Sequence, residues 1–115
     1  MLCVDVKFKD DVVADLTPST CLYLYLEDVS RADAAAIPVA KLSTLIHKKI
    51  RAGDRVALKL SIPDLTPTAH YALRAHLSID GDEIIAPEDY LTTQSFPLLT
   101  QGASSSPRLM MSPAA

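Results

Sequence analysis

Three histidines are the side chains of this sequence with the most versatile chemistry, and they stand far apart. His47, His70 and His76 fall on different expected elements, and His70 and His76 share the strand face that lies opposite the core. A metal or acid–base site needs convergent partners that hold each imidazole in place. We therefore expect solvated surface histidines.

Motifs that usually hold a nucleophile or a cofactor are missing from the sequence. It contains no Gly-x-Ser-x-Gly turn, no glycine-rich phosphate loop, no His-Glu-x-x-His and no Cys-x-x-Cys. The sequence therefore predicts a protein that is not an enzyme and that uses no cofactor and no metal.

One acidic run is a candidate cation site. Asp80, Asp82 and Glu83 surround Gly81, and alternate carboxylates could reach one Ca²⁺, but the distal bidentate glutamate of a calcium loop is absent. Asp-Gly-Asp also suits a tight hairpin, because glycine adopts positive φ readily. We favour a hairpin from the strand ending at Ile79 into a short strand at 83–85.

Charge is divided unevenly along the chain. The segment 41–59 has a single acid, Asp54, and residues 80–89 contain five acids and no base. The bases of the first segment are Lys41, Lys48, Lys49, Arg51, Arg55 and Lys59. Such segments either steer an oppositely charged partner or form solvated faces with weak internal pairs. The net charge of −3 argues against nucleic acid as a partner.

Two polar segments are candidate binding regions. Tyr90, Thr92, Thr93 and Gln94 form a hydroxyl and amide patch, suited either to a sugar or peptide edge or to local bonds with backbone. In the loop after residue 27, we expect structural roles for Asp28, Ser30 and Asp33. Arg31 is expected to pair with a carboxylate and is a candidate for partner binding.

Alternating aliphatic residues predict the strands that must position these groups. The pattern of a tyrosine corner, as in an immunoglobulin-like β-sandwich, is formed by Leu65, Pro67 and Tyr71. Tyr71 also begins a strand-like alternation of inward residues: Tyr71, Leu73, Ala75, Leu77 and Ile79. Similar alternation marks residues 2–8, 22–26 and 56–62. Residues 37–47 fit a strand or a helix, and we favour a strand. The prediction is an all-β, immunoglobulin-like sandwich of seven to eight short antiparallel strands.

Length and composition predict one domain and a monomer. We expect the sandwich over 1–102 and a flexible tail over 103–115, with a short closing strand at 108–111. Cys3 and Cys21 either pair or remain reduced, and we favour reduced thiols. As written, the chain shows no secretory signal and no apolar run long enough to span a membrane, which predicts a cytoplasmic protein.

Three segments together resemble a known family. Residues 24–34 (LYLEDVSRADA), 71–75 (YALRA) and 89–102 (DYLTTQSFPLLTQG) are similar to YbaY-like lipoproteins, which are grouped with the YscW-type lipoprotein chaperones, or pilotins, of type III secretion. The resemblance implies a β-sandwich tethered to a bacterial envelope membrane, without established enzymatic activity in the YbaY branch. In the pilotin branch it implies binding and localising a secretin subunit.

The sequence departs from that family at both ends. It carries no lipidated cysteine, so the lipid anchor is absent as written, and the short last strand would leave a sheet edge open to a partner's strand. We expect a non-enzymatic protein that binds a protein or peptide, as an envelope accessory or chaperone-like module. The alternative is a carbohydrate or small-ligand binding module, and a secretin pilotin is the less favoured hypothesis.

Overall fold

The computed structural model describes residues 2–12, 16–30, 35–46, 48–62, 70–92, 96–98 and 108–114. Within these ranges the regular structure consists of strands alone, so the predicted all-β class is confirmed. The eight strands are β1 (Leu2–Phe8), β2 (Cys21–Asp28), β3 (Ile37–Leu45), β4 (Arg55–Leu60), β5 (Tyr71–Ser78), β6 (Tyr90–Thr92), β7 (Phe96–Leu98) and β8 (Arg108–Pro113).

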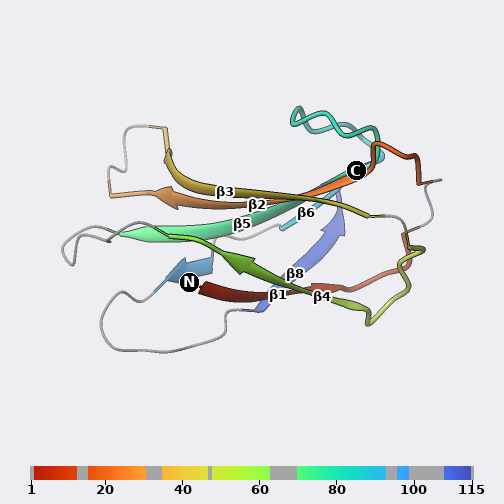
Figure 1. Ribbon diagram of the computed structural model, residues 1–115, viewed down its shortest axis with the longest axis horizontal. Coiled ribbons are helices and arrows are strands. Elements are labelled where there is room, and N and C mark those ends of the chain that lie inside the picture. Colours follow the sequence, from red (N-terminus) through yellow and green to blue (C-terminus); the bar gives the residue numbers. More distant parts are fainter. Residues whose placement is uncertain are drawn as a thin grey trace.

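All eight strands belong to one curled sheet. Its order is β3-β2-β5-β6-β8-β1-β4, and β7 pairs with β5. The sheet folds over so that β3, β2 and β5 lie above β8, β1 and β4 (Figure 1). Strands β3 and β4 approach each other without pairing, which leaves a nearly closed barrel.

The immunoglobulin-like sandwich is not confirmed. Strands β6 and β8 pair with each other and carry the hydrogen-bonded ladder from one layer to the other, so the two layers are parts of one sheet. The pairing of β1 with β8 is parallel, whereas every other strand pairing described is antiparallel. Alternation predicts which side chains face inward, but it does not fix how many sheets the strands make.

The core lies between the two layers and is mostly aliphatic. It is filled by alternate residues of facing strands: Val4, Val6 and Phe8 of β1, Leu22, Leu24 and Leu26 of β2, Leu58 and Leu60 of β4, Leu73, Ala75 and Leu77 of β5, and Leu109 and Met111 of β8. Tyr71 is buried in the same cluster, as the corner motif predicts, while Leu65 and Pro67 lie outside the described residues.

Strand β2 is buried on both faces, as its sequence predicts. It lies between β3 and β5, with its leucines in the core and Cys21, Tyr23 and Tyr25 in a second cluster on the outer face. The predicted strand at 37–47 is found as β3, at an edge of the sheet. Cys3 is exposed on β1 and Cys21 is buried, and both are free thiols.

The last strand does not leave an open edge. The predicted closing strand exists as β8, it extends to Pro113, and it lies between β6 and β1 with partners on both sides. The segment predicted as a tail thus supplies an inner strand. The two ends of the sheet's strand order are instead β3 and β4.

Candidate functional site

A pocket opens where β3 ends and β4 begins, between the two unpaired ends of the sheet. Its volume is about 400 Å³. It is lined by Leu45, Ile46, Lys48, Lys49, Ile50, Asp54, Arg55 and Val56, and we call it the β3–β4 pocket. Its size is at the lower end of the range of small-ligand sites, roughly 300–1,000 Å³.

The walls of the β3–β4 pocket are anchored to the core. Ile46 and Ile50 are buried, and their backbones bond to Thr20 (3.0 Å) and Val12 (3.1 Å). The turn before β4 is tied to β1, because the Gly53 N–H donates to the Phe8 carbonyl at 2.8 Å. The pocket is therefore framed by fixed backbone.

The rim of the β3–β4 pocket is basic. Lys48, Lys49 and Arg55 are exposed, and in the part of the chain that the structure describes none of them forms an ion pair. Asp54, the acid among the described lining residues, accepts a hydrogen bond from the Arg51 N–H at 2.9 Å. Leu45 is 54% exposed at the entrance. The arrangement suits an apolar group that carries negative charge.

A second, smaller hollow of about 210 Å³ lies between the end of β2 and the start of β3. Two of its lining residues hold backbone: Asp28 Oδ1 accepts from the Ser30 N–H, and Ser30 Oγ accepts from the His70 N–H, both at 2.9 Å. Arg31 and Asp33 lie outside the described residues.

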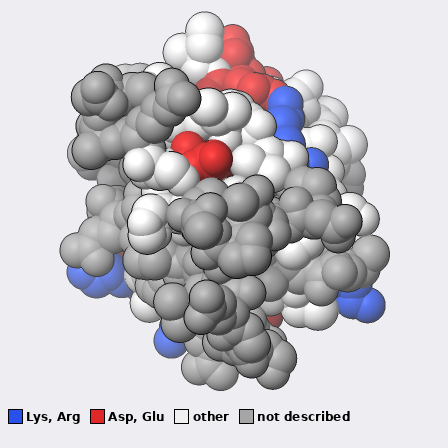
Figure 2. Space-filling view, turned by 90° about the vertical axis from the view of Figure 1, so that its left-hand side faces the viewer, with Lys and Arg blue, Asp and Glu red and all other residues white. Residues whose placement is uncertain are grey.

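At the end of the molecule seen in Figure 2, acidic side chains gather toward the top and basic ones are scattered near the edge of the view.

The predicted hydroxyl patch is only partly described. Tyr90 is buried in the core cluster, and its hydroxyl donates to the Asp11 carbonyl at 3.3 Å. Thr92 Oγ1 accepts from the Ala75 N–H at 3.2 Å, beside the last β5–β6 pair. Thr93 and Gln94 lie outside the described residues. The geometry of Tyr90 and Thr92 favours local bonding over the presentation of a ring to a sugar.

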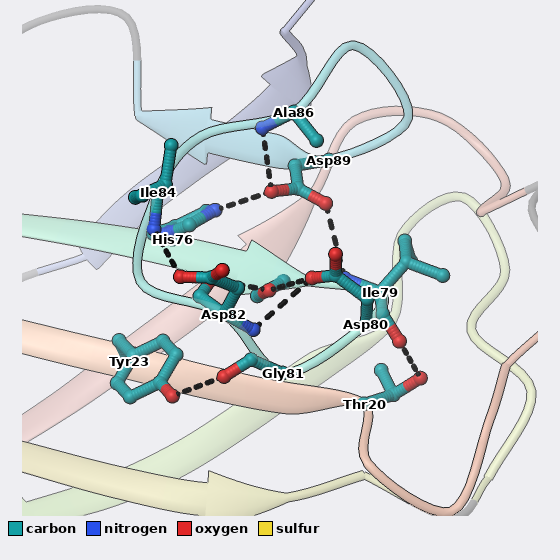
Figure 3. A network of polar contacts seen from close by, with 11 residues as sticks. Thr20, Tyr23, His76, Ile79, Asp80, Gly81, Asp82, Ile84, Ala86 and Asp89 are labelled. Atoms are coloured by element: carbon teal, nitrogen blue, oxygen red, sulfur yellow. Dashed lines mark hydrogen bonds and ion pairs between the residues drawn. The ribbon is translucent and has the colours of Figure 1, made fainter.

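His76 is buried, so the prediction that it is a solvated surface histidine is wrong. The loop of residues 79–89 folds back over the outer face of β5, where His76 Nε2 lies 2.7 Å from Asp89 Oδ2 and both side chains are at most 1% exposed (Figure 3). His76 Nδ1 is buried without a hydrogen-bond partner in the described structure. His70 is exposed, as predicted, and His47 lies outside the described residues.

Asp89 also ties both ends of the 79–89 loop. Its Oδ1 accepts from the Ile79 N–H at 3.1 Å, and its Oδ2 accepts from the Ala86 N–H at 3.0 Å (Figure 3). On the other side, Thr20 Oγ1 donates to the Ile79 carbonyl at 2.6 Å, and the Tyr23 hydroxyl donates to the Gly81 carbonyl at 2.6 Å. The loop is therefore a fixed cover over the outer face of the sheet.

The predicted hairpin into 83–85 does not form. Gly81 has the expected positive φ of 86°, but residues 83–85 are not a strand, and β6 pairs with β5 instead. Asp80 Oδ1 accepts from the Asp82 N–H and Asp82 Oδ1 accepts from the Ile84 N–H, both at 3.0 Å. Such local bonds compete with a strand ladder.

The carboxylates of the acidic run have partners within the protein. The Asp82 N–H and the Ser78 hydroxyl bond to Asp80 and lower the pKa of its carboxyl group. Glu83 pairs with Lys41 of β3. Across the described ranges, no three His, Cys, Asp or Glu side chains gather closely enough to hold a metal ion.

Alkaline pH is expected to destabilise the fold through Tyr23. Burial, followed by the nearby Cys21 thiol, raises the pKa of the Tyr23 phenol above 10.0. The stabilisation by the neutral phenol is complete below pH 10 and is lost as the pH rises through the raised pKa. Urea unfolding between pH 8 and pH 11 should show a smaller alkaline loss for Tyr23→Phe than for the native chain; equal losses would contradict this.

A model of one protein family matches almost the whole chain. The family is described as type III secretion system lipoprotein chaperone (YscW), and the match covers residues 5–111. The chain belongs to the YscW family. The resemblance noted in the sequence is thereby confirmed, and membership in a family of lipoprotein chaperones does not support the cytoplasmic expectation.

A solved structure has a similar fold. It is described as the structure of an alternative pilotin from the type II secretion system of Vibrio cholerae; its TM-score is 0.63 at 18% identity, over 96% of this chain and 95% of that chain. No curated protein is similar enough to this YscW-family chain to count as a match. The structure shows, in its described part, no helix with the length and apolar character needed to cross a membrane.

The basic residues of the β3–β4 pocket are evident in the sequence, but the pocket itself is not. Lys48, Lys49 and Arg55 stand out as a basic run, while their meeting with Leu45 and Val56 depends on how far the sheet curls. The His76–Asp89 pair left no signal, since nothing in a 13-residue separation indicates contact.

Proposed function

We propose that this protein is a non-enzymatic, chaperone-like binding protein that holds a segment of another protein in its β3–β4 pocket. The observation that carries the proposal is the pocket itself: an apolar floor and a basic rim, at the end of the molecule where β3 and β4 approach each other; among the described residues the rim forms no ion pair and the two strands do not pair. Membership in a family of lipoprotein chaperones supports a protein as the occupant.

The remaining chemistry of the described residues supports a role in binding. The 79–89 loop holds its own Asp89 against His76, and both side chains are at most 1% exposed, so a substrate has no access to them. Neither residue lines the β3–β4 pocket. A histidine and a carboxylate fixed in this way stabilise a loop, which is a structural role.

We propose a secretin subunit as the first partner to test, and an envelope location facing the periplasm. The fold is shared with a protein described as a pilotin, and the family is described as lipoprotein chaperones of a secretion system. Both descriptions favour the pilotin role over an unspecified accessory role. A carbohydrate site is not favoured, because Tyr90 is buried.

Reversing the charge of the pocket rim should weaken partner binding. We expect Lys48→Glu/Lys49→Glu to lower the affinity for the secretin subunit by about tenfold or more, because the proposed occupant carries negative charge and the substituted rim would repel it. Isothermal titration calorimetry with the secretin of the same organism measures this.

The matched control is Lys9→Glu/Lys59→Glu, which makes the same change of charge at exposed sites outside the pocket lining. Its affinity should stay within a factor of about three, the change that general charge effects produce when steering is weak. Equal losses of affinity in the two variants would contradict the β3–β4 pocket as the binding site. If the native chain does not bind the secretin, the secretin is not its partner.

A further inference from the structure

The 79–89 loop presents two isoleucines to solvent. Ile84 is 76% exposed and Ile85 is 51% exposed, and Ile84 is the most exposed large hydrophobic side chain in the described residues. An adjacent exposed pair on one loop is unusual, because single exposed apolar residues are common but grouped ones often mark an interaction surface.

The loop holds these isoleucines in a fixed place. Asp89 binds the backbone at Ile79 and Ala86, and the Asp82 carboxylate accepts from the Ile84 N–H itself (Figure 3). A loop ordered before it binds loses little conformational entropy on binding. The network therefore favours docking by these side chains.

The surroundings of the two isoleucines are acidic. Asp82, Glu83 and Glu88 are exposed on the same loop, and residues 80–89 include no base. Glu83 is paired with Lys41, whereas neither Asp82 nor Glu88 forms an ion pair among the described residues. The loop is thus an apolar tip with a negative border.

The β3–β4 pocket has the complementary character, an apolar floor with Lys48, Lys49 and Arg55 at its rim. In Figure 1 the loop (cyan) and the segments around the pocket (yellow to yellow-green) lie toward the same, right-hand end of the molecule. When two copies of a chain meet at one end about a twofold axis, the loop of each copy can contact the pocket of the other.

We propose that two copies of this chain associate at this end, with Ile84 and Ile85 of each copy in the β3–β4 pocket of the other. The dimer replaces the monomer expected from the sequence. It uses the pocket of the proposed function, so a partner segment and a second copy compete for it, but self-association itself needs no partner and is tested without one.

Sedimentation equilibrium of the purified native chain over a range of concentrations tests the proposal. We expect a reversible monomer–dimer equilibrium that weakens at high salt, because exposed charges are screened. Ile84→Ser/Ile85→Ser should raise the dimer dissociation constant by about tenfold or more, as apolar anchors at an interface do. A native chain that stays monomeric at the highest soluble concentration overturns the proposal.

A charge exchange identifies the surfaces. Lys48→Glu/Lys49→Glu and Glu83→Lys/Glu88→Lys should each lose self-association, and a mixture of the two should form a dimer, since both contacts are then oppositely charged again. None of these four side chains holds the loop backbone in the described structure. Each variant is first checked for a native circular dichroism spectrum.

A mixture that stays monomeric, or variants that dimerise like the native chain, would place the interface elsewhere and overturn the proposal. Neither result changes the conclusion from the secretin titration, because the titration measures how the secretin binds to the pocket of one copy. Conversely, if the secretin does not bind but the two charge variants form a dimer when mixed, the proposed dimer is supported without the secretin.

Discussion

Replacing Asp89 by alanine is expected to lower the free energy of unfolding by about 3–5 kcal/mol, because three hydrogen-bond donors lose their acceptor and each buried donor left unsatisfied costs about 1–3 kcal/mol. The Asp89 side chain is fully buried and accepts hydrogen bonds at three places: His76 Nε2 (2.7 Å), the Ile79 N–H (3.1 Å) and the Ala86 N–H (3.0 Å). Its loss leaves His76 buried with both ring nitrogens unpartnered in the described structure, and leaves two backbone donors unpaired.

Urea unfolding followed by circular dichroism measures this loss. The matched control is Glu88→Ala, the exposed neighbour on the same loop, which should change the free energy by no more than about 0.5 kcal/mol. A loss below about 1 kcal/mol for Asp89→Ala would mean that Asp89 is not the residue that fastens the loop.

Replacing Gly81 by alanine is expected to be the second large effect, at about 2–5 kcal/mol. Two costs add: a positive φ of 86°, unfavourable for a residue with a Cβ by roughly 1–2 kcal/mol, and crowding, which costs roughly 1–3 kcal/mol in packed sites. The added Cβ would lie 3.2 Å from the Ser19 Cβ and closer still to the Ser19 backbone carbonyl oxygen, which cannot rotate away.

Gly53 supplies the control for this substitution. It has the same φ of 86°, but a Cβ built there meets no atom within 4 Å, so Gly53→Ala should show the backbone cost of roughly 1–2 kcal/mol alone. The difference between the two variants isolates the contact of the 79–89 loop with the turn before β2. Equal losses in urea unfolding would contradict the placement of Gly81 against Ser19.

The strands could be predicted because each has its own periodic signal. Val4, Val6 and Phe8 alternate with polar residues and are buried, and the tyrosine motif placed Tyr71 in the core. The number of sheets had no such signal, because it depends on the pairing of β6 with β8, strands that are separate in sequence. Short β6 and the parallel β1–β8 pairing follow from tertiary contacts rather than from local pattern.

The site was less predictable than the fold for a related physical reason. Burial of His76 depends on a loop that crosses the outer face of its strand, and that crossing depends on Asp89 finding the backbone at Ile79 and Ala86. Likewise, Lys48 and Arg55 are separated in sequence by the buried Ile50 and a turn, and the pocket whose rim they share depends on how closely the sheet brings β3 toward β4. Neither the burial of His76 nor the pocket between β3 and β4 can be inferred from the composition or from the spacing of residues.

The most direct test of the binding site is an amide chemical-shift map of the isotope-labelled protein, titrated with synthetic peptides that together cover the secretin subunit. We expect the shifts with the largest changes to belong to residues 45–56, around the β3–β4 pocket, and we expect Lys48→Glu/Lys49→Glu to reduce them strongly at the same peptide concentration. Changes confined to the hollow at Asp28 and Ile37, or spread evenly over the sheet, would contradict this expectation.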